Sequence, residues 1–275
     1  MRFNPGKPSM RIALLAAVAT ACLTIAMPTP ATALPPPVPC QGCTAFPPTT
    51  DPWQIQFQGK LNFKVKKASV IDIDGFDNSA ATVSTLEAGG RKTLCYISAG
   101  SWENWRPDQG DFPPELLGNV YDGYPDERWL DIRRMDLLAP ILEARIQMCK
   151  DKGFDAVDPD NLNGFENDTG FPLTAGDQIN FNAWLANLVH SKGLAVGLKN
   201  DGPQVGTLVN YYDFAIVESC FQYEECSPYE SFVQNGKAVF AIEYKRPKKY
   251  CAEAKLLGFS AIYKRPDLKA SRITC

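Results

Sequence analysis

Short apolar segments recur along the chain from residue 68 onward, and most of them end in polar residues. Each predicts a buried strand, because it is a nearly continuous apolar run of only about four to eight residues. The clearest is 154–160, where an apolar body changes abruptly to Asp158 and Asp160. The predicted strands are residues 68–74, 93–100, 129–133, 154–160, 195–200, 214–218, 238–243 and 260–264.

Helical patterns lie between most of these strands. Residues 137–152 carry apolar side chains near one helical turn apart, and Gly153 follows as a typical helix end. Thr174 and Asp177 form a capping pair at the start of a second helix, and a third spans 250–257. Eight strands that alternate with helices in about 220 residues predict an α/β fold, a closed (β/α)8 TIM barrel rather than an open doubly wound sheet. No G-x-G-x-x-G follows the first strand, which also disfavours the open sheet.

The first 33 residues predict a secretory signal peptide. A basic start precedes an apolar run at 12–27, and an Ala-Thr-Ala cleavage site occupies 31–33. We therefore expect a signal at 1–33, a proline-rich leader at 34–52 and one barrel domain at 53–275 of a secreted, extracellular protein. A lipid-anchored cell-surface form attached through Cys22 is the alternative. No later segment is long and apolar enough to predict a membrane span.

Nine cysteines fit export. Loss of Cys22 with the signal leaves eight, at positions 40, 43, 95, 149, 220, 226, 251 and 275. An even number in an exported chain predicts disulfides, and we expect Cys220 to pair with Cys226 because they flank one short loop. Cys40 and Cys43 form a C-x-x-C that suggests a zinc or redox site instead. A second C-x-x-C and a histidine partner are both missing from the sequence, so no metal is expected there.

The net charge of the mature chain disfavours two classes of binding partner. The predicted signal holds three of the 28 basic residues and none of the 31 acidic residues, so the mature chain has a net charge of −6. This balance argues against binding to nucleic acid or to anionic membrane surfaces.

Polar residues at the strand ends are the candidate chemistry, because active sites of such barrels lie at the C-terminal ends of the strands. Asp160 and Glu218 follow different strands and can face one another across the barrel mouth, as the two carboxylates of glycoside hydrolases do. One would act as general acid and the other as nucleophile or base. Two alternatives stay open: Asp158 to Asn161 as a helix-capping loop, and Glu218 as an ion-pair partner of Lys199. The other candidates for binding substrate at strand ends are Asp72, Asp74, Tyr96, Ser98, Asp131, Asp158, Asn161, Lys199 and Asn200.

Two further patterns were weighed as metal or catalytic sites. The acids at 72–78 resemble a calcium loop in composition, but the later acidic ligand of an EF-hand is missing. His190 is the only histidine and lies near the end of a helix before a strand, which disfavours a Ser-His-Asp triad and a multi-histidine metal site. We expect neither a metal nor a cofactor.

Aromatic residues crowd the loops after several strands. Sugar rings stack on aromatic faces, and cations are drawn to them. Trp102 and Tyr244 are therefore candidate substrate-binding residues, although ordinary loop packing is the alternative for each aromatic here. The other loop aromatics are Trp105, Tyr121, Tyr124, Phe221 and Tyr223.

Several ordered motifs resemble glycoside hydrolase family 114, the endo-α-1,4-polygalactosaminidases. They lie at residues 53–56, 71–74, 95–100, 129–133, 153–161 and 199–200. The resemblance implies a (β/α)8 barrel that hydrolyses α-1,4-linked galactosamine polymers, with Asp160 and Glu218 as its acids. An acidic cleft would attract a cationic amino-sugar polymer, which agrees with this substrate.

Our sequence-based hypothesis is a monomeric endo-glycosidase with Asp160 as nucleophile or base and Glu218 as acid. In it, Asp72, Tyr96, Asp158 and Lys199 shape the sugar site. A non-catalytic cell-surface carbohydrate-binding protein on the same barrel, and a glycosidase for another exopolysaccharide, are the alternatives.

Overall fold

Eight parallel strands form the centre of the molecule. The computed structural model describes residues 34–65 and 67–275; the predicted signal peptide and Cys22 lie outside the described residues. Every neighbouring pair from β1 to β11 is parallel, and the short β12 (Ile273–Thr274) pairs antiparallel with β11. The barrel strands, in spatial order, are β1 (Gln54–Gln56), β2 (Val70–Asp74), β3 (Lys92–Ser98), β7 (Ala156–Asp160), β8 (Ala195–Lys199), β9 (Phe214–Glu218), β10 (Ala238–Glu243) and β11 (Ser260–Tyr263).

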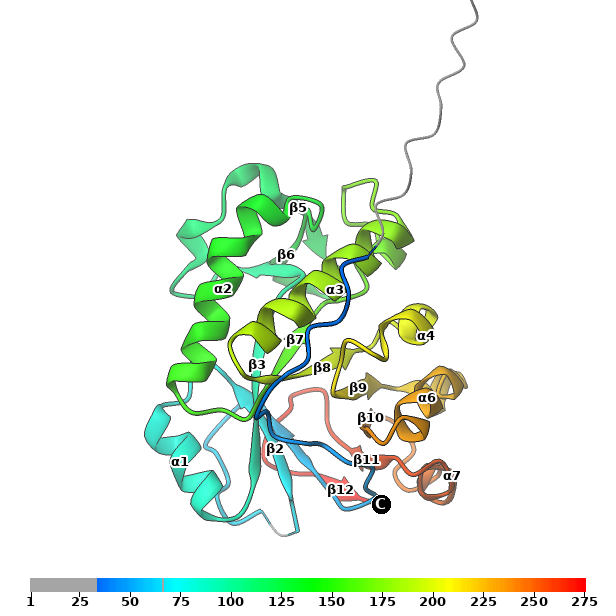
Figure 1. The fold of residues 1–275 in the computed structure, drawn as a ribbon. Helices are drawn as coiled ribbons and strands as arrows, with labels where there is room; N and C mark the ends of the chain where they lie inside the picture. The colour runs from blue at the N-terminus through cyan, green and yellow to red at the C-terminus, as the bar shows by residue number, and fades with distance from the viewer. Residues whose placement is uncertain (1–33, 66) are drawn as a thin grey trace, which may run out of the picture. The chain divides into compact units, whose positions relative to one another are not determined.

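The predicted (β/α)8 barrel is confirmed (Figure 1), and the residues after β11 contact β1 and the residue after it. Lys264, directly after β11, donates from Nζ to Oε1 of Gln54 at 3.2 Å. The backbone N–H of Phe57, just after β1, donates to the carbonyl of Leu268 at 3.1 Å. These contacts close the barrel between its first strand, β1, and its last, β11.

Two strand predictions need correction. The first barrel strand, β1, was not predicted, because its three residues are too few to show a hydrophobic periodicity. The predicted barrel strand at 129–133 is wrong: these residues overlap β6 (Tyr124–Leu130), which lies in a separate antiparallel sheet with β4 (Ser101–Glu103) and β5 (Leu117–Tyr121). Its apolar residues are buried because this inserted sheet packs on the barrel, and burial alone does not say which sheet a strand joins. Residues 68–74, predicted as the first barrel strand, therefore contain the second one, β2.

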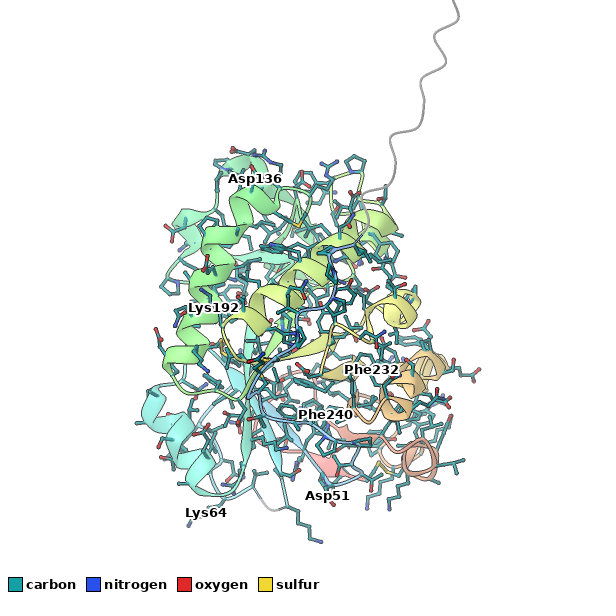
Figure 2. The ribbon with its side chains drawn as sticks, in the orientation of Figure 1. Asp51, Lys64, Asp136, Lys192, Phe232 and Phe240 are labelled. Carbon is teal, nitrogen blue, oxygen red and sulfur yellow. A yellow bond between two sulfur atoms is a disulfide. The ribbon has the colours of Figure 1, made fainter. Side chains whose placement is uncertain are left out.

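Side-chain alternation divides the core into two layers. One apolar cluster, which includes Val70, Ala156 and Phe240, fills the barrel interior. The other, which includes Ile71, Val157 and Phe232, lies between the sheet and the helices (Figure 2). Residues two positions after Val70 and Ala156 face inward as well, so the interior changes from apolar to acidic towards the C-terminal ends of the strands.

Helices cover the outside of the barrel (Figure 1). The predicted helices at 137–152 and 250–257 correspond to α2 and α7, and the predicted capping box of Thr174 and Asp177 is present at the start of α3. No described helix is long and apolar enough to cross a membrane. The α-helices are α1 (Ala80–Ala88), α2 (Met135–Asp151), α3 (Ala175–Ser191), α4 (Val205–Leu208), α5 (Cys220–Tyr223), α6 (Glu230–Gln234) and α7 (Cys251–Leu257). The 3-10 turns are η1 (Gln109–Asp111), η2 (Pro114–Leu116), η3 (Gly164–Glu166), η4 (Gly202–Gln204) and η5 (Ser227–Tyr229).

In the described part of the chain, four disulfides link neighbouring segments, and the proline-rich leader packs on the outside of the barrel. The predicted pair Cys220–Cys226 is confirmed, and the others are Cys40–Cys43, Cys95–Cys149 and Cys251–Cys275. The leader runs beside α3 (Figure 1), where His190 contacts the carbonyl of Val38 through Nδ1 and Asp213 through Nε2. His190 therefore fastens the leader to the barrel, far from the acidic strand ends.

Candidate functional site

Three neighbouring strands deliver the central charges of the site. Asp160, Lys199 and Glu218 are the last residues of β7, β8 and β9. Lys199 Nζ lies 2.8 Å from Oδ1 of Asp160 and 3.4 Å from Oε2 of Glu218. These two carboxylate oxygens are thus at most about 6.2 Å apart, the limit that the two contacts to one nitrogen allow. The sequence-predicted acids converge, and the Lys199 ion pair predicted as the alternative for Glu218 is present as well.

Each of these strands is followed directly by a residue with left-handed backbone conformation. The φ angles are 67° at Asn161, 54° at Asn200 and 58° at Ser219. Asparagine tolerates this region because its short side chain bonds to nearby groups, whereas serine does so at some cost. The sharp turn stops each strand at the charged residue, so that the side chain stands at the barrel mouth. Strain of this kind gathers at functional sites.

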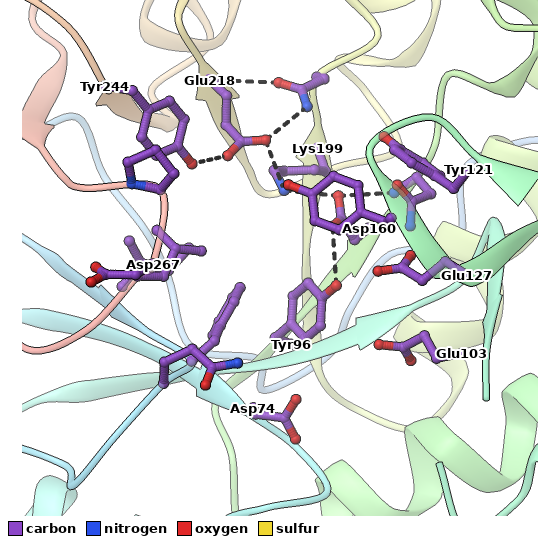
Figure 3. A pocket seen from close by; sticks show the side chains of 18 of the residues that line it. Asp74, Tyr96, Glu103, Tyr121, Glu127, Asp160, Lys199, Glu218, Tyr244 and Asp267 are labelled. Carbon is purple, nitrogen blue, oxygen red and sulfur yellow. Dashed lines mark hydrogen bonds and ion pairs between the residues drawn. The ribbon is translucent and has the colours of Figure 1, made fainter. Parts of the chain in front are cut away.

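Hydrogen bonds orient both acids. Tyr96, from β3, donates its hydroxyl to Oδ2 of Asp160 at 3.1 Å, and Tyr244, directly after β10, donates to Oε1 of Glu218 (Figure 3). Asn200 accepts the backbone N–H of Glu218 at 3.0 Å and its amide lies 3.4 Å from Oε2. The oxygens of both carboxylates therefore have fixed directions before any substrate arrives.

A second pair of acids lies beneath the first. Asp72 and Asp158 face into the barrel and are fully buried. Burial, and then the charge of Asp158, raise the pKa of Asp72 well above its ordinary value. Burial also raises the pKa of Asp158 to about 6, although Lys199 opposes the shift. Two buried carboxyl groups close to one another resist carrying two charges, so burial and the charge of Asp158 favour the protonated form of Asp72.

A cavity of about 770 Å³ opens above these acids. The inserted sheet and the turn after β4 form one wall and bring Glu103, Arg106, Tyr121, Tyr124 and Glu127 to it. Figure 3 shows the side chains of Glu103 and Glu127 on the side of Asp160 away from Glu218. Burial, followed by the nearby charges of Glu103 and Asp160, raises the pKa of Glu127 to about 7, against a hydrogen bond from Ser101.

The acids of this wall are not among the site residues predicted from the sequence. Glu103 and Glu127 lie on β4 and β6, which were not recognised as a separate sheet. Their available signal was local: Glu103 follows a strand end by a few residues, and Glu127 precedes the motif at 129–133. Tyr121 and Tyr124 were noted as loop aromatics but not selected as site residues.

Most of the remaining predicted site residues either line the cavity or are buried directly behind it. Asp74, Tyr96, Asn161, Lys199, Asn200 and Tyr244 line the cavity together with Asp160 and Glu218. Asp72, Ser98 and Asp158 are buried behind its surface, where Ser98 bonds to Ser101 and Asn161.

The structure does not bring Trp102 or Asp131 to the cavity. Trp102 alternates with Glu103 on β4, so its indole faces away and donates to the carbonyl of Gln109. Asp131 follows β6, outside the barrel, and pairs with Arg133 at 2.7 Å. Asp131 was predicted on the premise that residues 129–133 form a barrel strand, and that premise is wrong. Trp102 was predicted as an aromatic of the loop after residues 93–100, but it lies on β4, and there Glu103 rather than Trp102 faces the cavity.

Metal ligation has no support in the described part of the chain, where no group of three or more histidine, cysteine or acidic residues is arranged to hold an ion. The acids at 72–78 do not form a calcium loop. Oδ1 of Asp74 accepts the backbone N–H groups of Phe76 and Asp77, and both of its oxygens contact Arg106.

Comparisons with known proteins agree with this geometry. The model of glycoside-hydrolase family GH114 matches residues 34–275. The crystal structure of Aspergillus fumigatus Ega3 in complex with galactosamine is similar, with a TM-score of 0.80 and 36% identity over 87% of this chain and 99% of Ega3. The glycoside hydrolase domain of PelA from Pseudomonas aeruginosa shares the fold, with a TM-score of 0.67 and 13% identity over 81% of this chain and 98% of that domain. No functionally curated protein matched the chain.

Proposed function

The chain belongs to glycoside-hydrolase family GH114 and is a glycosidase, and we propose that it is a secreted, monomeric, endo-acting enzyme that cleaves α-1,4-linked galactosamine polymers. One observation carries the proposal: Asp160 and Glu218 flank a single buried lysine at the floor of an open cleft. Two carboxylates that can reach the same glycosidic bond are the usual equipment for this reaction.

The reaction uses the two acids in turn. Glu218 protonates the glycosidic oxygen while Asp160 attacks the anomeric carbon, so the bond between that carbon and the leaving sugar breaks and a glycosyl-enzyme ester forms. Glu218 then removes a proton from water, which attacks the same carbon and releases Asp160. Oδ1 of Asp160 and Oε2 of Glu218 lie at most about 6.2 Å apart, which is compatible with the separation of about 5–5.5 Å in retaining enzymes.

The donors around Asp160 support its role as nucleophile. Tyr96, Lys199 and the backbone N–H of Asn161 all donate to it. An ionised carboxylate accepts hydrogen bonds only, so this environment suits the charged form that attacks carbon.

The cleft chemistry supports an amino-sugar substrate. Its lining contains seven acidic and four basic residues, and a deacetylated galactosamine polymer carries an ammonium group on each unit near neutral pH. The similarity to Ega3, whose crystal structure contains galactosamine, supports the same choice. Four disulfides fit secretion, because such bonds persist in oxidising compartments.

The test is incubation of the purified protein with galactosamine oligomers, with products analysed by mass spectrometry. We expect shorter oligomers, initial release of the product with retained anomeric configuration by proton NMR, and a loss of about 10²–10⁴-fold in rate for Asp160→Asn and for Glu218→Gln. Asp131→Asn, a carboxylate outside the cleft, is the control and should keep wild-type activity.

Other results would point elsewhere. Binding of the oligomer without cleavage would identify a carbohydrate-binding protein, and cleavage of a different exopolysaccharide alone would change the substrate. Wild-type activity in Asp160→Asn or Glu218→Gln would remove that residue from the mechanism.

A further inference from the structure

Glu127 is a cleft carboxylate without a cation of its own. It lies on β6 directly opposite Glu103 on β4, and its residue surface is 9% exposed. Oε2 accepts the hydroxyl of Ser101 at 2.8 Å. The side chain lines the same cavity as Asp160 and Glu218. One oxygen is thus anchored, and the other remains for a ligand.

Each of the neighbouring acids already has a cation in contact, with one cation for each pair of acids. Arg106 bonds to Glu103 at 2.7 Å and to Asp74 at 2.8 Å, and Lys199 pairs with Asp160 and Glu218. Within residues 34–65 and 67–275, no lysine or arginine forms an ion pair with Glu127. Burial raises the pKa of Glu127 to about 7, so a cation bound in the cavity that Glu127 lines would stabilise its ionised form.

Glu127 is also tied to the catalytic strand. The hydroxyl of Ser101, which holds Glu127, contacts Oγ of Ser98 at 2.7 Å and the amide of Asn161 at 2.8 Å. Asn161 directly follows Asp160 and donates its backbone N–H to it. A group bound by Glu127 would therefore have a defined position relative to Asp160.

Two tyrosines complete the surroundings. Tyr121 is stacked on Trp129, with 4.5 Å between ring centroids, and Tyr124 packs against Tyr121 at 5.3 Å. Both line the cavity beside Glu127. Aromatic faces beside a carboxylate suit a sugar ring that carries a positive charge.

We propose that Glu127 binds the 2-ammonium group of a galactosamine unit beside the scissile bond and so makes the enzyme selective for deacetylated polymer. This inference rests on the proposed function. An N-acetylated unit has no charge to offer and adds an acetyl group where the anchored carboxylate stands. Binding of the N-acetylated unit would leave the charge of Glu127 buried without a cation. Such a loss of a buried partner is how a site discriminates strongly against a close analogue of its substrate.

Binding tests the inference apart from cleavage. The affinities of a galactosamine oligomer and of its fully N-acetylated form are measured by calorimetry at pH 7, with Glu218→Gln as the cleavage-deficient reference. Adding Glu127→Gln should weaken binding of the galactosamine oligomer about 10–100-fold and change binding of the acetylated one less than about threefold. The glutamine keeps an oxygen for the Ser101 hydroxyl, so the melting temperature should hold.

Asp122→Asn is the matched control. It removes one acid from the exposed turn of the same hairpin, where solvent and salt screen its charge, and should change the affinity for either oligomer by less than about twofold. Unchanged selectivity in Glu127→Gln, or equal losses in both variants, would overturn the inference even if the wild-type enzyme cleaves galactosamine polymer. Absence of cleavage by wild type would instead contradict the proposed function and leave the selectivity measurement valid.

Discussion

Nζ of Lys199 lies 2.8 Å from Oδ1 of Asp160, although the lysine side chain is only 3% exposed. Burial alone would lower the pKa of Lys199, but the charges of Asp160, Glu218 and Asp158 outweigh it and raise the pKa well above its ordinary value. Lys199 therefore keeps its positive charge throughout the working pH range. This charge lets the acids above and below it lie close together.

Replacing Lys199 by methionine should damage both activity and folding. Asp160 and Glu218 would repel one another, and the charge on the buried Asp158 would lose its partner. We expect kcat/KM to fall about 10²–10³-fold and the free energy of unfolding to fall by about 3–5 kcal/mol. Steady-state kinetics and urea unfolding measure the two effects. In Lys199→Met/Asp158→Asn the stability should recover in part and the activity should not; recovery of activity would contradict a direct role for Lys199.

Asp158 should make stability depend on pH. Its pKa is about 6 in the folded protein, above the value of about 3.9 for an unfolded chain. A raised pKa means that the folded state binds the extra proton, so this contribution to stability is fully present below about pH 4 and is lost as the pH rises through 6. Asp158→Asn does not titrate at this position. Its free energy of unfolding relative to wild type should therefore increase by about 1 kcal/mol between pH 5 and pH 7. A constant difference in urea unfolding at the two pH values would refute this.

Gly100 should not accept a side chain. A Cβ at this position would lie 1.8 Å from the carbonyl oxygen of Asn161. Gly100→Ala must push Asn161 away, and Asp160 moves with it because the N–H of Gly100 bonds to the carbonyl of Asp160. We expect a stability loss of about 1–3 kcal/mol and a loss of kcat of at least about tenfold. Gly110→Ala, where a Cβ meets open space, is the control. Equal kinetics for both variants would show that the close contact between Gly100 and the backbone of Asn161 tolerates the methyl group.

The disulfides should differ in their effect on stability. Cys95–Cys149 closes 54 residues of sequence and joins β3 to α2, whereas Cys220–Cys226 closes six. In the chain-entropy account, loss of the first costs about 4 kcal/mol and loss of the second about 2 kcal/mol. Thermal unfolding of the two double alanine variants compares them directly. The opposite order would mean that native packing, rather than the unfolded chain, sets the contribution of each bond.

Alternation within strands made much of the barrel and the centre of the site predictable. Ala156, Asp158 and Asp160 had to lie on one face of β7, and parallel strands present their C-terminal ends at the same edge. The convergence of Asp160, Lys199 and Glu218 follows from these two facts once a barrel is assumed. The predicted pair Cys220–Cys226 rested on closeness in sequence, the one kind of pairing that needs no fold.

Contacts between segments distant in sequence could not be predicted in the same way. β1 is a strand because β2 and the residues after β11 pair with it, and its three residues carry no period. Glu103 rather than Trp102 faces the cleft because of the register of β4 on β6, and a shift of one residue would exchange them.

By itself, the sequence determined which strands are buried and which of them end in acids, because apolar runs and their polar ends are local properties of the chain. Only the tertiary structure decided which acids have cations. Arg106 reaches Glu103 and Asp74, and Lys199 reaches Asp160 and Glu218, while Glu127 has neither. The physical reason is that an ion pair forms between atoms a few ångströms apart in space, and folding sets that distance across separations in sequence of any length.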